Sequence, residues 1–191
     1  MANAKGASLV GAVKWLRRER KAALRALPER LHHYLEKQIQ LASWYPEEDL
    51  LGLIRGVAKT LPAAGGDVYE QMGRFSAREQ LAGVYRHLLE GGDEVSLPRR
   101  GLVLWQSQHD SGRLGMTMEG PGVARVEIVD FALPSRELCG VLRGYTAEMF
   151  AMADLKGLGV EESSCRLDGA DRCAWRIRWT PVRPAAPAAS R

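Results

Sequence analysis

Two cysteines flank a turn-forming sequence in the stretch "SCRLDGADRCAW" (164–175). The Asp-Gly-Ala-Asp between them favours a hairpin that turns at Gly169. On adjacent antiparallel strands, Cys165 and Cys173 would then face each other at a Cα separation of about 4.5–5.5 Å. A disulfide, a pair of core thiols and a metal site are all compatible with this spacing.

The third and last cysteine, Cys139, stands near the start of a predicted helix upstream. An odd number of cysteines favours burial or metal ligation over a disulfide framework, and free cysteine is itself a common core residue. Three thiolates are ligands that Zn²⁺ takes, and a tetrahedral site needs a fourth donor. Strand alternation places Glu161 on the face of Cys165, whereas Glu162 would reach that face only through a bulge.

The first hundred residues carry helical periodicity. Apolar side chains recur at helical spacing in four segments, with a Gly-rich break at 62–66 before the last of them. The segments are 8–19, 28–42, 43–61 and 67–91. We therefore expect a mainly helical part over 8–100.

The period changes after residue 100. Residues 113–120 and 123–133 alternate as two strands around the turn signal "EGPG", and a bulge is expected near Val129. Residues 135–154 begin with the N-cap Ser135 and predict a helix.

A second hairpin follows, formed by 159–167 and 171–182. In its last strand the Cys and Trp side chains share one face and the arginines take the other.

These elements predict an α+β fold in which N-terminal helices pack with a short antiparallel sheet of two hairpins joined by a helix. We expect one domain over 1–182, with the sheet-rich part at 101–182. The tail 183–191 is rich in Pro and Ala and is expected to be disordered.

Composition limits the functions that the chain can have. The net charge is +4 and the pI about 9.1, and basic residues are not interleaved with aromatic ones as a nucleic-acid groove requires. No apolar run approaches the roughly 20 residues of a membrane span, and most positive charges follow rather than precede the N-terminal apolar stretch. No nucleophile elbow, phosphate loop or dinucleotide motif occurs. We expect a cytoplasmic protein that is not an enzyme and binds no nucleic acid.

The cysteine region resembles the zinc-binding pattern of the 4-vinyl reductase-like domain, found in sensor domains of bacterial regulators that respond to phenols and related aromatics. The resemblance covers 101–182 and matches four positions, Cys139, Glu162, Cys165 and Cys173. It implies a zinc ion held by these four, and so prefers Glu162 to Glu161. Such a closed site stabilises a fold and does not activate water. Arg136, Arg166 and Arg172 flank the ligands and would offset their negative charge.

That domain belongs to a superfamily that includes haem-based nitric-oxide sensors and vesicle-tethering subunits, with an α+β fold that is often dimeric. Over 8–180 the chain is also similar to a large set of myxobacterial paralogues, through segments such as "ASWYPEEDLLGLIRGVA" and "GRFSAREQLAGVYRHLL". The haem sensors' Tyr-x-Ser-x-Arg propionate clamp has no counterpart here. We therefore expect the histidines to face solvent; they are His32, His33, His87 and His109.

The resemblance implies a cavity between helices and sheet that takes a small apolar or aromatic molecule. Candidate lining residues are His87, Trp105, Met118, Phe131, Tyr145 and Phe150, although core packing produces the same aromatic and Met spacing. In the phenol sensors a His and a Trp hold the phenolic hydroxyl, and the position of that Trp is Met118 here.

We expect a zinc-stabilised sensor module that signals through a partner protein and forms a homodimer. A ligand-free interaction or scaffolding subunit of the same fold is the alternative.

Overall fold

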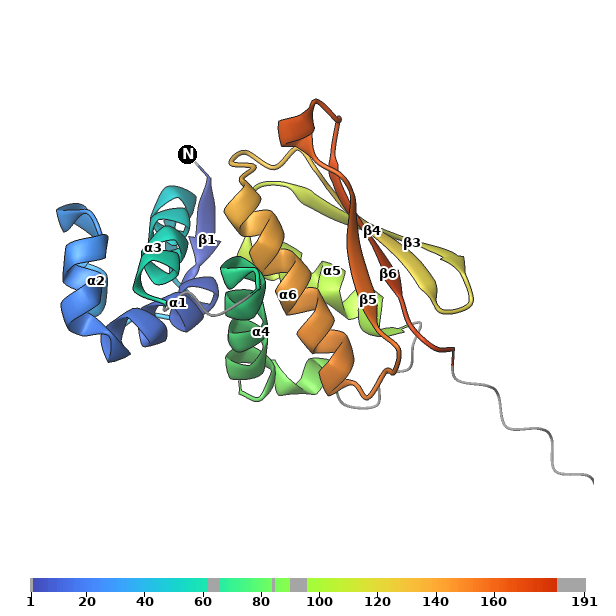
Figure 1. Cartoon of the computed structure of the whole chain (residues 1–191), viewed down its shortest axis with the longest axis horizontal. Coiled ribbons are helices and arrows are strands. Elements are labelled where there is room, and N and C mark those ends of the chain that lie inside the picture. Colours follow the sequence, from blue (N-terminus) through green and yellow to red (C-terminus); the bar gives the residue numbers. More distant parts are fainter. Residues whose placement is uncertain (1, 62–65, 84, 90–95, 182–191) are drawn as a thin grey trace, which may run out of the picture.

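The computed structural model describes residues 2–61, 66–83, 85–89 and 96–181 (Figure 1). The α-helices are α1 (Gly6–Arg18), α2 (Arg20–Ala26), α3 (Glu47–Thr60), α4 (Val68–Leu81), α5 (Ser96–Gln108) and α6 (Arg136–Met152). Short 3₁₀ helices are η1 (Glu29–Leu35), η2 (Arg86–Leu88) and η3 (Arg166–Asp168). The strands are β1 (Asn3–Lys5), β2 (Trp44–Pro46), β3 (Arg113–Gly120), β4 (Val123–Val129), β5 (Gly159–Ser164) and β6 (Cys173–Arg178).

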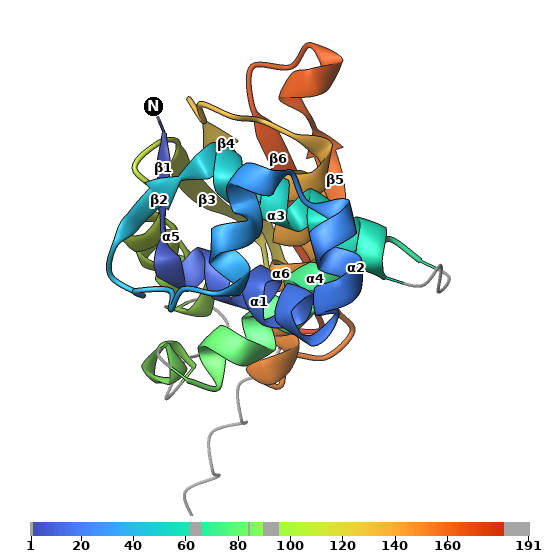
Figure 2. The same ribbon diagram turned by 90° about the vertical axis from the view of Figure 1, so that its left-hand side faces the viewer.

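The main sheet is antiparallel, with the strand order β3-β4-β6-β5. Its two hairpins are joined by α6, which together with α4 and α5 covers one face (Figure 1). The helices α1, α2 and α3 form a further layer in front of α4 and α6 (Figure 2). This arrangement confirms the predicted α+β fold.

Alternation along β6 explains how the sheet separates core from surface. Trp175 and Ile177 are buried under the helices, whereas Arg176 and Arg178 point outward. Arg178 pairs with Glu161 of the neighbouring strand β5 at 2.6 Å, and Arg176 pairs with Glu119 of β3 at 2.8 Å. The predicted alternation of this strand is confirmed.

Helices α4 and α6 pack so closely that their contact requires glycine on both sides. A Cβ at Gly144 would lie 1.9 Å from the carbonyl oxygen of Glu70, and one at Gly73 would lie 2.0 Å from that of Val141. Backbone atoms cannot give way as a flexible side chain can. The two glycines therefore set the distance between the helices.

Two helix predictions need correction. Residues 28–42 form only the 3₁₀ helix η1 followed by turns, because burying Leu31 and Tyr34 at i, i+3 spacing is satisfied by a 3₁₀ helix as well as by an α-helix. The pattern over 67–91 is interrupted after α4, and η2 follows separately.

Helix α5 was not expected, and it crosses the boundary that the sequence placed between residues 100 and 101. Pro98 suggests a break, but it lies in the first turn of α5, where no backbone N–H is needed.

The prediction of a bulge near Val129 is wrong. β3 and β4 pair regularly up to Arg113 opposite Val129, and the register shift lies at the other end, between Met118 and Gly120. β4 ends at Val129 because Asp130 adopts a left-handed conformation with φ +54°. The predicted turn at Gly169 is present, with φ +88°. Residues 62–65 of the Gly-rich break and the tail 183–191 lie outside the described residues.

No helix within the described ranges combines the length and apolar character needed to cross a membrane.

The α4–α6 contact makes a prediction about stability. Replacing Gly144 by Ala should lower the free energy of unfolding by about 1–3 kcal/mol, because the new methyl group overpacks a backbone contact. Urea denaturation followed by circular dichroism measures this change. The matched control is Gly101→Ala in α5, where the Cβ would meet only the Met149 Cε at an ordinary 3.5 Å. Equal stability of the two variants would contradict the close contact.

Candidate metal centre and ligand cavity

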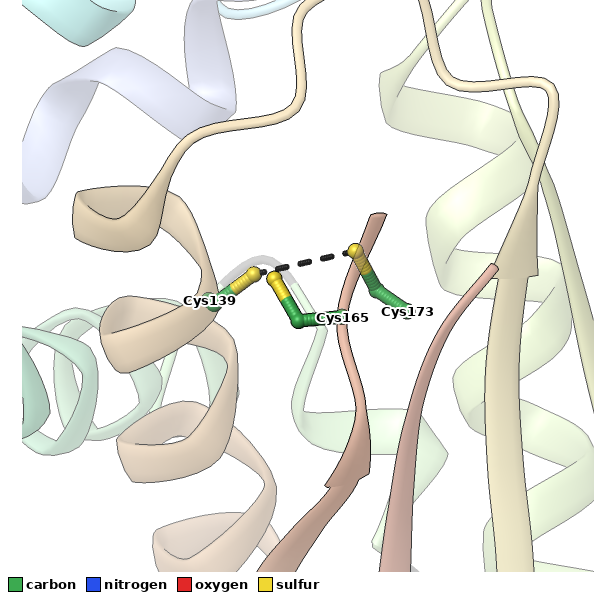
Figure 3. Close-up of side chains that lie close together, drawn as sticks. All are labelled: Cys139, Cys165 and Cys173. Atoms are coloured by element: carbon green, nitrogen blue, oxygen red, sulfur yellow. Dashed lines mark hydrogen bonds between the residues drawn. The ribbon is translucent and has the colours of Figure 1, made fainter. Parts of the chain in front are cut away.

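The three cysteines converge in the structure (Figure 3). Cys139 comes from the first turn of α6, Cys165 directly follows β5, and Cys173 opens β6. Their Sγ atoms lie within 4.8 Å of one another, with 4.0 Å between Cys139 and Cys173. All three are free, buried thiols. Zn–S bonds of about 2.3 Å in a tetrahedron place sulfurs about 3.8 Å apart, so small side-chain shifts suffice to bind the ion.

The two candidate carboxylates point in different directions. Glu162 lies opposite Trp175 of β6, on the inner face of the sheet, and its carboxylate is near enough to raise the pKa of the Cys165 thiol; its side chain is 27% exposed. Glu161 is 67% exposed and pairs with Arg178 on the outer face of the sheet. The register shift between Glu162 and Ser164 is the irregularity that turns Glu162 toward the thiols.

Burial keeps the Cys139 and Cys165 thiols protonated when no cation is present. Desolvation raises the pKa of the Cys139 thiol well above its usual range, and the neighbouring Cys173 and Cys165 raise it further. Burial also raises the pKa of Cys165, and the Glu162 carboxylate adds to this rise. A bound divalent cation would reverse this balance, because it favours the thiolate forms.

Two of the three flanking arginines contact the proposed ligands, which are the three thiols and Glu162. Arg136 lies 3.6 Å from the Glu162 carboxylate, and the backbone N–H of Arg166 donates to the Cys173 Sγ at 3.5 Å. Arg172 instead binds acidic side chains of its own turn and of β4.

A cavity of about 130 Å³, here called the central cavity, lies between the helices and the sheet. Its apolar lining is Leu50, Ile54, Met72, Leu104, Trp105, Leu114, Val126, Ile128, Leu138, Val141, Leu142, Met149, Phe150, Trp175 and Ile177. Its other lining residues are Ser8, Ser76, Gln80, Gly101, Gln108, His109, Tyr145 and Thr146. Among the described residues, no Lys, Arg, Asp or Glu lines it.

Hydrogen bonds hold the polar side chains of this lining. The Gln80 amide donates to the Ala7 carbonyl at 2.8 Å and accepts from the Tyr145 hydroxyl at 3.0 Å. Burial raises the pKa of Tyr145, so its hydroxyl stays a neutral donor. The Ser8 hydroxyl donates to Gln108. These four polar side chains of the lining are therefore held by hydrogen bonds within the protein.

His109 is the one imidazole in the described lining of the central cavity. Its side chain is only 8% exposed, its Nδ1 lies 3.1 Å from the Glu47 carboxylate, and its ring stacks on Trp105 with centroids 4.0 Å apart. The expectation that His109 faces solvent is wrong, because the carboxylate and the indole hold it inside.

Three of the predicted ligand contacts, Trp105, Tyr145 and Phe150, line the central cavity. Phe131 lies behind it, with its ring edge-on to Trp105 at 5.4 Å. Sequence reasoning missed Gln80 and Gln108, since amides at helical positions carry no motif.

The remaining predicted contacts lie elsewhere. Met118 is 36% exposed on β3, and His87 is exposed on η2. His33 is exposed, and His32 is half-buried beside the Leu27 carbonyl.

Solved structures with the same fold are H-NOX domains. The chain superposes with a TM-score of 0.67 and 16% identity on an oxygen-binding H-NOX domain related to soluble guanylate cyclases, covering 95% of this chain and 98% of that one. The chain superposes on an S. oneidensis H-NOX protein in the Fe(II) ligation state with a TM-score of 0.67 and 16% identity, covering 94% of this chain and 97% of that one. A third structure comes from work on modulating haem redox potential through protein-induced porphyrin distortion. The chain superposes on it with a TM-score of 0.65 and 16% identity, covering 95% of this chain and 98% of that one.

The fold is thus that of the H-NOX domains, one of the folds that the resemblance in the sequence implied. The sequence matches no protein-family model and no curated protein. The likeness to the 4-vinyl reductase-like domain therefore stays a prediction.

The residues of this cavity do not fit a haem. Two propionates need cationic partners, and the described lining holds no Lys or Arg. A volume of about 130 Å³ is also well below the roughly 300–1,000 Å³ of pockets that enclose larger ligands. The Nδ1 of His109 is bound to Glu47, and one face of its ring is covered by Trp105.

We expect purified protein titrated with hemin to give the absorbance spectrum of free hemin, with no saturation at one equivalent. His109→Ala and the exposed control His33→Ala should behave alike. A one-to-one haem complex that is lost in His109→Ala and kept in His33→Ala would contradict this assessment.

Proposed function

We propose that this chain is a cytoplasmic, zinc-stabilised sensor module that binds a small, largely apolar molecule in the central cavity and signals through a partner protein. The observation that carries the proposal is the cavity itself, which is mainly apolar, has no Lys, Arg, Asp or Glu in its described lining, and is lined by both parts of the fold. Three free thiols agree with a reducing compartment. The homodimer implied by the resemblance stays a prediction.

The size of the cavity limits the ligand. An apolar cavity of about 150 Å³ is known to bind benzene, whereas drug-sized ligands need about 300 Å³ or more. The central cavity measures about 130 Å³. A molecule of roughly benzene size with at most one polar group is therefore the best fit.

The elements that line the central cavity suggest how ligand binding could reach a partner protein. Ser8 of α1 and Ile54 of α3 line the cavity together with Trp175 of β6. A ligand would contact the N-terminal helices and the sheet at once, and would favour the relative position in which both sides touch it. A partner that contacts both sides would detect this shift.

The proposed zinc ion would be held by Cys139, Cys165 and Cys173, with Glu162 as the fourth donor. When bound, it would supply a structural crosslink between α6 and the β5–β6 hairpin. Arg136 would balance part of the negative charge through Glu162. The proximity of the three sulfurs and the position of Glu162 on the inner face of the sheet, just before the register shift, support this assignment.

The alternative is a ligand-free interaction subunit of the same fold. A filled core and a large exposed apolar patch would favour it. The apolar central cavity favours the sensor.

Protein purified without chelators should contain close to one zinc per chain, measured by elemental analysis. Cys165→Ser should lose the metal and several kcal/mol of unfolding free energy, because the bound ion stabilises only the folded chain. Glu162→Gln should weaken zinc binding, whereas the control Glu161→Gln, whose carboxylate faces Arg178, should not. Metal well below one per chain would refute the zinc site, and equal effects of the two Gln variants would refute Glu162 as its fourth donor.

The second test uses benzene as the probe. Saturating benzene should shift the NMR signals of the Met149 and Ile128 methyl groups and, at about 100 times its Kd, stabilise the fold by about 2.7 kcal/mol. Gly101→Leu should abolish both effects by filling the cavity beside Met149, and Gly101→Ala should retain them. Shifts that persist in Gly101→Leu, or no saturable shift in the wild type, would reject the proposed function.

A further inference from the structure

The positive charge of this chain is concentrated near its N-terminus. Residues 1–46 carry nine Lys or Arg against three Glu, whereas residues 47–191 carry 18 Lys or Arg against 20 acidic residues. The first of these segments forms β1, α1, α2, η1 and β2. The excess positive charge therefore lies on these N-terminal elements and not on the main sheet.

Most of the N-terminal cations lack an acidic partner. Lys14, Arg20 and Arg30 form salt bridges. By contrast, every arginine in α6 and in the strands of the main sheet pairs with at least one carboxylate. Six of the nine N-terminal cations form no salt bridge with the carboxylates that the structure describes; they are Lys5, Arg17, Arg18, Lys21, Arg25 and Lys37.

Large apolar side chains are exposed among these cations. Leu24 lies on α2, Leu41 lies in the segment that leads to β2, and Trp44 is the first residue of β2. Lys21, Leu24 and Arg25 are spaced i, i+3 and i+4, so they share one face of α2. The N-terminal elements thus expose apolar groups beside unpaired positive charges.

Contacts place these groups on one side of the molecule. The Arg17 guanidinium donates to the Lys37 carbonyl at 2.5 Å, so the end of α1 lies beside the segment that leads to β2. The Lys5 Nζ donates to the Ala42 carbonyl at 2.7 Å and lies 3.9 Å from the centroid of the Trp44 ring. Figure 2 shows α1, α2 and this segment on the side that faces the viewer. We call the exposed side chains there the basic face; they are Lys21, Leu24, Arg25, Lys37, Leu41 and Trp44.

We propose that the basic face binds the surface of a bilayer that contains anionic phospholipids. Its three apolar side chains enter the boundary between headgroups and acyl chains, which is also where Trp is enriched in membrane proteins. Its three cations lie against the anionic headgroups, and each Lys or Arg near such a surface strengthens binding. Apolar contact and charge together supply the two signals that stable membrane attachment needs.

A bilayer fits this surface better than the other anionic partners do. Nucleic acids bind cations through their phosphates and stack their bases on aromatic rings, which gives the two exposed leucines no role. A bilayer also needs no shaped pocket, and none of the six side chains lines the central cavity. The inference therefore does not depend on the proposed function.

Cosedimentation with lipid vesicles tests the proposal. In about 0.1 M NaCl the protein should bind vesicles of phosphatidylcholine with about 30% phosphatidylglycerol, and it should not bind vesicles of pure phosphatidylcholine. The affinity for the anionic vesicles should fall at least tenfold in about 1 M NaCl, because the Debye length shrinks from about 10 Å to about 3 Å.

Charge variants identify the surface that binds. Lys21→Gln combined with Arg25→Gln should lower the affinity for anionic vesicles about tenfold or more. The matched control removes two exposed cations of β3 and of the loop after α6, by Arg113→Gln combined with Lys156→Gln. This control loses the same charge and should bind as the wild type does.

Apolar variants test the insertion. Leu41→Ser should weaken vesicle binding several-fold, whereas Leu167→Ser, at a similarly exposed leucine of η3, should leave it unchanged. Trp44 is exposed, whereas Trp105 and Trp175 are buried, so its indole should dominate any change in fluorescence. Anionic vesicles should shift the emission of the wild type to shorter wavelength, and this shift should be absent in Trp44→Phe.

All these substitutions are at exposed side chains, and circular dichroism checks that each variant is folded. Four results would overturn the proposal. They are no binding to the anionic vesicles, equal binding to the neutral vesicles, equal losses in the two double charge variants, and tighter binding to poly-glutamate than to the vesicles. The last result would assign the basic face to an acidic protein.

Discussion

The close packing of α4 against α6 is the contact on which the other features of this protein depend. Gly73 and Gly144 bring the two backbones together, and any side chain there would collide with a carbonyl oxygen. Side chains of both helices, among them Met72, Gln80 and Tyr145, line the central cavity between this pair and the sheet. The same packing fixes the start of α6, where Cys139 meets the hairpin cysteines.

The layer formed by α4 and α6 therefore separates two parts of the interior that differ in their polar groups. Toward the sheet, polar groups such as Gln80 and Tyr145 satisfy one another, and the space that is left is apolar. Toward the N-terminal helices, the Trp15 indole N–H has no acceptor among the described residues, and arginines form part of the wall of a second cavity. Because burial makes unpaired polar groups costly, the interior that faces the sheet suits a neutral guest.

The H-NOX fold and the absence of a haem-compatible lining fit together once fold and site are considered separately. A fold fixes where a cavity can form, between the sheet and the helices that cover it. The side chains decide what enters it. Here His109 is held by Glu47 and covered by Trp105, and the described lining offers no cation for propionates. The same scaffold thus supports a site of different chemistry.

The sequence alone determined the α+β class, the alternation of β6 and the turn at Gly169, because these depend on local periodicity and turn chemistry. It also singled out the three cysteines. It missed α5, since Pro98 reads as a break unless its place in the first turn is known. Only the tertiary structure decided that His109 is buried and that Trp15 lacks an acceptor. Burial and pairing of such side chains depend on residues far away in the chain, which no local pattern records.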